Sequence, residues 1–310
     1  MTDYMLCSMV DLNLPKERLL FMKHGIYYAY WEKEWAADYI PYIEKAAKLG
    51  FDILEIGGAA LPALNDAQLS EIKSAADANG IIITTGYGPA PAHDVGCLET
   101  REGALEWYRK MFYGMEKIGS NVIGGALYSH WPVDYSQPIN KEEDWKLAVE
   151  GMQILSKIAR NHGVQLNMES LNRFEGYLIN TAEECVKFVK EVNCDNVWVM
   201  LDTFHMNIEE TDIAQAIRTA GSLLGHFHTG ECNRMVPGRG RIPWREIGKA
   251  LREIGYNKTV VMEPFVNTGG QVGSDIKIWR ELIPGITPEM LDKDAADSLA
   301  FQRYMFDGNM

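Results

Sequence analysis

The sequence lacks any hydrophobic run long enough to cross a membrane, which takes about 20 consecutive apolar residues in a helix. Its first residues, with Asp3, Asp11 and Pro15, do not follow the charged-then-apolar order of a secretory signal. The five cysteines are an odd number, are scattered and contain no C-x-x-C pair. Neither a disulfide framework nor a structural zinc knot is therefore predicted, and we expect a protein of the reducing cytoplasm.

The sequence also has fewer basic residues than acidic ones. The chain has 30 lysines and arginines against 43 aspartates and glutamates, which gives a formal net charge of −13. Nucleic acids and anionic membrane surfaces attract basic surfaces, so this balance argues against both as partners. A small neutral molecule is the expected substrate.

The chain of 310 residues is predicted to form one catalytic domain behind a short extension. No low-complexity linker divides it, and barrel domains often exceed the usual domain size. Residues 1–21 precede the first convincing strand and are predicted to be an N-terminal extension, with a short helix around Pro15 to Phe21. Residues 22–310 are predicted to form the catalytic domain.

Strand-like and helix-like patterns alternate through this domain. The strand-like runs are apolar along most of their length, as expected for parallel strands buried on both faces. Apolar residues three and four apart recur between them, and several helices end at glycine. Eight such units predict a closed (β/α)8 barrel. The runs are His24 to Trp31, Asp52 to Gly57, Ile81 to Gly86, Asn121 to Tyr128, Val164 to Glu169, Val197 to Asp202, Leu224 to Thr229 and Thr259 to Phe265.

Acids and a histidine fall at the ends of four consecutive predicted strands. Glu169, Asp202, His228 and Glu263 are each about one strand-helix unit apart, so they should meet at the carboxyl end of the barrel. Taken singly, each could be a solvated acid or a locally bonded histidine. Together, their charges would repel unless a cation lay between them. Three carboxylates and one imidazole suit Mn²⁺, Co²⁺ or Mg²⁺ better than a sulfur-rich zinc site.

Other polar and aromatic residues are predicted to lie at the same rim. His205 follows Asp202 by three residues. Arg234 follows His228 by six residues, and Glu175 follows Glu169 by six. Aromatic residues such as those at the ends of the first and fourth strands are natural walls for the C–H surfaces of a sugar, although core packing would account for most of them.

Six motifs, taken in order, support a family assignment. They are Met-Lys-His-Gly-Ile-Tyr-Tyr-Ala-Tyr-Trp-Glu from Met22, Ile-Gly-Gly-Ala-Leu-Tyr-Ser at 123–129, Leu-Asp-Thr-Phe-His-Met-Asn-Ile-Glu-Glu at 201–210, Gly-His-Phe-His-Thr-Gly-Glu-Cys-Asn-Arg at 225–234, Pro-Gly-Arg-Gly-Arg-Ile-Pro-Trp at 237–244 and Val-Met-Glu-Pro-Phe at 261–265. From Met22 to about Trp279 the chain closely resembles the D-psicose (D-allulose) 3-epimerases, relatives of D-tagatose 3-epimerase.

The resemblance implies a single xylose-isomerase-like TIM barrel that acts on free ketohexoses. It implies one divalent metal ion per subunit, bound by two glutamates, an aspartate and a histidine, and a homo-oligomer of two or four chains. The implied metal ligands are Glu169, Asp202, His228 and Glu263. The implied substrate contacts are Tyr27, Trp131, Glu175, His205 and Arg234.

Epimerisation at C3 of a ketose explains why these residue types are needed. This reaction would interconvert D-fructose and D-psicose, and in the same way D-tagatose and D-sorbose. A base removes the C3 proton beside the C2 carbonyl, and an acid returns one to the opposite face of the enediolate. Glu169 and Glu263 are the predicted pair. The alternative enzyme is a metal-dependent isomerase that moves the carbonyl between C1 and C2. A sugar-binding protein without catalysis would explain the aromatic residues but not four converging ligands.

Overall fold

The computed structural model describes residues 22–307, in which eight parallel strands close into a barrel. The predicted extension, residues 1–21 with its helix around Pro15 to Phe21, lies outside the described residues. The strands are β1 (Lys23–Tyr27), β2 (Ile53–Gly57), β3 (Ile82–Gly86), β4 (Val122–Gly125), β5 (Gln165–Glu169), β6 (Val197–Asp202), β7 (Leu224–Thr229) and β8 (Thr259–Met262). The barrel predicted from the alternating pattern is confirmed.

Pairing between the first and last strands closes the barrel. β1 pairs in parallel with both β2 and β8, and each strand from β2 to β7 pairs with its two neighbours in sequence. On β6 and β7, Asp202 lies opposite His228. On β7 and β8, Thr229 lies opposite Met262, and the N–H of Glu263 donates to the Thr229 carbonyl over 2.9 Å. The register therefore brings the carboxyl ends of β6, β7 and β8 to one level.

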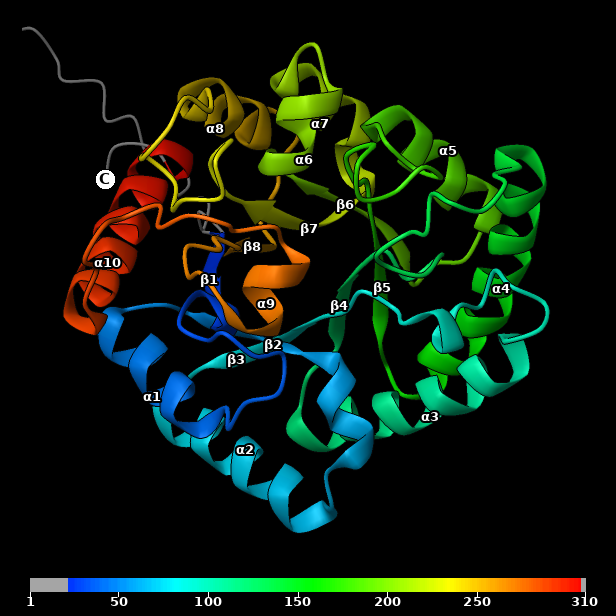
Figure 1. The fold of residues 1–310 in the computed structure, drawn as a ribbon, viewed down its shortest axis with the longest axis horizontal. Helices are drawn as coiled ribbons and strands as arrows, with labels where there is room; N and C mark the ends of the chain where they lie inside the picture. The colour runs from blue at the N-terminus through cyan, green and yellow to red at the C-terminus, as the bar shows by residue number, and fades with distance from the viewer. Residues whose placement is uncertain (1–21, 308–310) are drawn as a thin grey trace, which may run out of the picture.

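Helices surround the barrel (Figure 1). They are α1 (Ile40–Leu49), α2 (Asp66–Asn79), α3 (Arg101–Ile118), α4 (Lys141–Asn161), α5 (Ala182–Val192), α6 (Thr203–Glu209), α7 (Ile213–Ala220), α8 (Trp244–Glu253), α9 (Gly270–Asp275) and α10 (Pro288–Phe306), with 3-10 turns at Tyr28–Tyr30, Gly58–Ala63, Pro91–His93 and Gly221–Leu223. The last helix, α10, packs against α8 and α1 and so completes the outer ring. The short helices α6 and α9 follow the carboxyl ends of β6 and β8.

Three strands end earlier than their apolar runs predicted. β1 stops at Tyr27, and Tyr28–Tyr30 form a buried 3-10 turn. β4 stops at Gly125, whose φ of 131° leaves the extended conformation. β8 stops at Met262, so Glu263 lies just beyond it. An apolar run indicates burial, and most of the residues that follow these three strands are buried although they lie outside the strand.

The sequence also led to expectations about membrane-spanning helices and disulfides. Among the described helices, none is both long and apolar enough to cross a membrane. Cys97, Cys185, Cys194 and Cys232 are free thiols.

Gly225 provides a test of how tightly the barrel is packed. A Cβ added to this β7 residue would lie 2.2 Å from Asn167 Oδ1 and 2.5 Å from Trp198 Cβ. We expect Gly225→Ala to lower the free energy of unfolding by about 1–3 kcal/mol through overpacking. Gly103, in α3, has no atom within 4 Å of an added Cβ, so Gly103→Ala should be neutral or slightly stabilising. Denaturant unfolding measures both changes, and equal effects would contradict this packing.

Candidate active site

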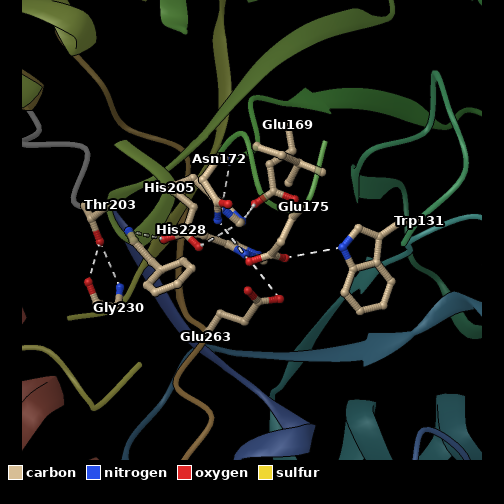
Figure 2. A network of polar contacts seen from close by, with 12 residues as sticks. Trp131, Glu169, Asn172, Glu175, Thr203, His205, His228, Gly230 and Glu263 are labelled. Atoms are coloured by element: carbon tan, nitrogen blue, oxygen red, sulfur yellow. Dashed lines mark hydrogen bonds and ion pairs between the residues drawn. The ribbon is translucent and has the colours of Figure 1, made fainter. Parts of the chain in front are cut away.

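The four predicted metal ligands lie together at the carboxyl end of the barrel. Glu169 is the last residue of β5 and Asp202 the last of β6, while His228 is the penultimate residue of β7 and Glu263 directly follows β8. The ligand atoms of Asp202, His228 and Glu263 are within 4.8 Å of one another, and those of Glu169, Asp202 and His205 form a second such group. The two groups share Asp202. Figure 2 shows Glu169, His205, His228 and Glu263 gathered around one point.

This cluster contains buried polar atoms that fit a bound cation. Among the described residues, Glu169 Oε1, Asp202 Oδ2 and His228 Nδ1 are buried without a hydrogen-bond partner. Buried polar atoms normally have one, so three such atoms in one cluster require an explanation. Carboxylate oxygens and an imidazole nitrogen are good ligands for hard and intermediate divalent ions. The donor set therefore fits a metal ion.

The electrostatics of Glu169 indicate the same need for positive charge. Burial raises the pKa of Glu169 well above its usual range, and the neighbouring carboxylates of Glu263 and Asp202 raise it further. His228 and Arg234 act in the opposite direction without compensating for this effect. A cation between the carboxylates would favour the ionised form of Glu169.

His205 presents a single N–H to the cluster. Its Nδ1 lies 2.8 Å from Asn172 Nδ2 and accepts the backbone N–H of Asn172 over 3.2 Å. Burial lowers the pKa of His205, so the ring is neutral and carries its proton on Nε2. That atom is 3.8 Å from Glu169 Oε1 and 3.9 Å from Asp202 Oδ2, too far for a direct hydrogen bond. The Nε2–H is therefore free to donate to a ligand.

Arg234 supplies the positive charge on the other side of the cluster. Its Nη1 lies 3.3 Å from Glu263 Oε2 and 3.5 Å from Asp202 Oδ2. Its Nη2 lies 3.3 Å from Glu175 Oε1, and its Cζ is 3.6 Å from the centre of the Phe204 ring. The backbone has a φ of 64°, in the left-handed region that is costly for a residue with a side chain. Strained backbone of this kind is common at functional sites.

Glu175 links the cluster to an aromatic wall (Figure 2). Asn172 Nδ2 donates to its Oε1 over 3.0 Å, and Trp131 Nε1 donates to its Oε2 over 3.3 Å. Burial alone would raise the pKa of Glu175, but the guanidinium of Arg234 and these hydrogen bonds bring it below its usual value. Glu175 is therefore a carboxylate that faces the cavity.

A cavity of about 350 Å³ opens over the cluster. This is within the range of about 300–1,000 Å³ that small-molecule sites occupy. All the predicted site residues except the fully buried Asp202 line it, and the structure thus brings the whole predicted set together. Further aromatic side chains form its walls, namely Tyr28, Trp35, Tyr87, Trp107 and Phe265.

Sequence reasoning missed two titratable residues below the cluster. Glu55, in β2, and His226, in β7, are fully buried and hydrogen-bonded to each other. Burial alone would raise the pKa of Glu55, but the imidazoles of His228 and His226 hold it well below its usual range. The available signals were a single acid within an apolar strand and a histidine two residues before His228, on the same face of the strand.

Hydrogen bonds between His130 and Asp94, a titratable pair, hold the loop that carries Trp131. Asp94 Oδ2 accepts hydrogen bonds from His130 Nδ1 over 2.8 Å and from the His130 backbone N–H over 3.1 Å. The hydrogen bond to Asp94 raises the pKa of His130 above its usual value. Stabilisation by the pair is therefore complete below the unfolded pKa of histidine, about 6.5, and is lost as the pH rises through the higher folded pKa.

We expect His130→Gln to remove this pH-dependent part of the stability. Glutamine can still donate to Asp94 but does not titrate, so the stability advantage of the unmodified protein over the variant should fall as the pH rises from about 6.5. Urea unfolding across this range measures the difference. A constant difference would show that the pair does not titrate as described.

Comparisons with known proteins agree with this geometry. A family model described as xylose isomerase-like TIM barrel matches residues 43–284. A D-psicose 3-epimerase of Ruminiclostridium cellulolyticum is 56% identical over 288 residues, covering 92% of this chain and 98% of that protein. A D-psicose 3-epimerase of Agrobacterium fabrum is 52% identical over 289 residues, covering 93% and 100%.

Solved structures give the same result. A crystal structure of D-psicose 3-epimerase with D-tagatose, from Clostridium cellulolyticum H10, superimposes with a TM-score of 0.91 at 56% sequence identity, covering 92% of this chain and 99% of that chain. The barrel is therefore shared along almost the whole length of both chains. The chain belongs to the xylose isomerase-like TIM barrel proteins and, among them, to the D-psicose 3-epimerase family.

Proposed function

We propose that this protein epimerises free ketohexoses at C3, interconverting D-fructose and D-psicose, with D-tagatose and D-sorbose as a further pair. The observation that carries the proposal is the cluster of buried, unpartnered donor atoms on Glu169, Asp202 and His228 at the floor of a sugar-sized cavity. The names of the relatives support the reaction type.

Glu169, Asp202, His228 and Glu263 are proposed to bind one divalent ion per subunit. The ion is proposed to be Mn²⁺ or Co²⁺, with Mg²⁺ as a weaker candidate. Such an ion would supply positive charge to the substrate oxygens on which negative charge develops when the C3 proton leaves. The three carboxylates and the neutral imidazole nitrogen are its ligands. The absence of cysteine from this set favours these ions over zinc.

Glu169 and Glu263 are proposed to move the proton. They reach the cavity from β5 and from the end of β8, which are not neighbouring strands. One carboxylate can then take the proton from C3 on one face while the other returns a proton to the opposite face. Because the reaction is reversible, their roles exchange with its direction.

His205 and Arg234 are proposed to stabilise the oxyanion at O2. Within residues 22–307, the Nε2–H of His205 has no acceptor at hydrogen-bond distance, and it faces the carboxylates of Glu169 and Asp202. The guanidinium of Arg234 lies beside Glu263 on the other side. Donors that are already oriented toward a developing charge lower the barrier without further reorganisation.

The cavity is proposed to select unphosphorylated sugars. Arg234 is the only lysine or arginine among the described residues that line it, and three carboxylates already surround that side chain. A phosphate group would find no free positive charge there. Tyr27 and Trp131 would instead contact the sugar's C–H surfaces, and Glu175 would accept a hydrogen bond from a hydroxyl group.

The active form is proposed to be a cytoplasmic homo-oligomer of two or four chains. The resemblance to the epimerase family supports the assembly, and exposed aromatic side chains such as Phe174 and Trp279 are available for contacts between chains. The free thiols of the described cysteines suit a reducing compartment. Light scattering after size exclusion should give two or four times the chain mass, and a monomer would contradict the assembly.

The reaction is tested by incubating chelator-stripped protein with D-fructose and, separately, with D-psicose. We expect interconversion only after Mn²⁺ or Co²⁺ is restored, followed by chromatography of the sugars. An aldose as the main product would instead identify an isomerase that moves the carbonyl between C1 and C2. Tight sugar binding with no product would identify a binding protein.

We expect Glu169→Gln and Glu263→Gln each to lower kcat by at least about 100-fold at saturating Mn²⁺. Glutamine keeps the shape of the side chain but cannot accept or return the proton, and positioned acid-base groups contribute about 10²–10⁴-fold. Glu106→Gln, on the exposed face of α3, is the control and should leave kcat unchanged. Near-normal turnover in either site variant would refute the two-carboxylate scheme.

A further inference from the structure

One carboxylate inside the barrel, that of Glu55 in β2, receives three hydrogen bonds from two other strands, β3 and β7. Glu55 Oε1 lies 2.6 Å from His228 Nε2, and its Oε2 lies 2.9 Å from His226 Nε2. The hydroxyl of Thr84, in β3, also donates to Oε2 over 2.7 Å. Glu55 itself is fully buried. None of the chemical steps described above uses this group.

The same network fixes the second histidine. His226 Nδ1 lies 2.6 Å from the hydroxyl of Thr259, in β8. Since a carboxylate can only accept, the proton of His226 is on Nε2, and Nδ1 accepts from Thr259. The network thus extends from β3 through β2 and β7 to β8, with a defined donor at each of these bonds.

The distances describe hydrogen bonds and leave no space for an ion among Glu55, His226 and His228. Ligand atoms bound to one ion at about 2.0–2.2 Å lie roughly 3 Å or more apart. The separations here are 2.6 Å and 2.9 Å, and both oxygens of Glu55 have donors. In contrast, His228 Nδ1 is 3.6 Å from Glu263 Oε1 and has no hydrogen-bond partner among the described residues.

We propose that Glu55 is a positioning residue that holds His228 in the orientation and tautomer needed to bind the metal. By accepting the Nε2–H, it leaves the lone pair of Nδ1 facing the carboxylates of Asp202 and Glu263. A histidine ligand whose other nitrogen donates to a carboxylate is oriented and made more basic, and loss of such a partner costs about 10–100-fold in metal affinity. This inference rests on the ligand set proposed above.

Glu55→Gln tests the proposal with little change of shape. The amide has one oxygen and one nitrogen, so it can accept from only one of the two rings and presents N–H groups to the other. We expect the dissociation constant for Mn²⁺ to rise about 10- to 100-fold. The electron paramagnetic resonance signal of free Mn²⁺, recorded during titration of the chelator-stripped full chain, measures it without reference to turnover.

Two adjacent threonines provide a matched pair of variants. Thr84 and Thr85 are both buried in β3, but the Thr84 hydroxyl binds Glu55 while that of Thr85 lies 3.0 Å from Ser120 Oγ. Thr84→Val removes one hydrogen bond from Glu55 and should weaken Mn²⁺ binding by about 2- to 10-fold. Thr85→Val loses a comparable hydrogen bond and should bind Mn²⁺ within twofold of the unmodified protein.

Thermal unfolding of the metal-free proteins separates positioning from simple stability. If Glu55→Gln and Thr84→Val lower the melting temperature as Thr85→Val does but bind Mn²⁺ as the unmodified protein does, the proposal is overturned. Should Glu55→Gln fail to fold, the comparison of the two threonine variants decides the question. If the unmodified protein binds no Mn²⁺, or Asp202→Asn binds it equally well, the ligand set itself is wrong and this inference fails with it.

Discussion

Uncompensated negative charge at the mouth of the barrel is the constraint on which the rest of the structure depends. Glu169, Asp202 and Glu263 converge there, and the burial of Glu169 and Asp202 removes the water that would otherwise solvate their charges. Arg234 offsets part of this charge at the expense of a left-handed backbone conformation. A divalent ion would offset the remainder, and its positive charge is also what the removal of a C3 proton requires.

The closed barrel makes this convergence possible because consecutive strands bring their carboxyl ends to the same rim, with those of β6, β7 and β8 at one level. Asp202 and His228 face each other across β6 and β7, and the backbone of Glu263 continues the hydrogen bonding beyond the end of β8. The polar partners beneath and beside them then fix which ring nitrogen faces the centre. His205 is oriented by Asn172 from the loop after β5, and His228 by Glu55 from β2.

The sequence predicts the barrel and the four ligand positions because both follow from a repeated strand-helix unit along the chain. Glu169, Asp202 and His228 end or nearly end their strands as predicted, and Glu263 lies one residue beyond its strand. The link between Glu55 and the histidines of β7 was not predicted, since it crosses the barrel interior between strands far apart in sequence. Strand ends were also misplaced where buried loops continue an apolar run, as at Tyr28–Tyr30.

Epimerisation in deuterated water tests the central claim most directly. With Mn²⁺ present, the two-carboxylate account predicts that deuterium enters C3 of the product ketose, since one glutamate removes the original proton and the other delivers one exchanged with solvent. Proton and carbon NMR locate the label. Deuterium at C1 with an aldose as product, or a C3-inverted ketose that retains its original hydrogen, would contradict the account.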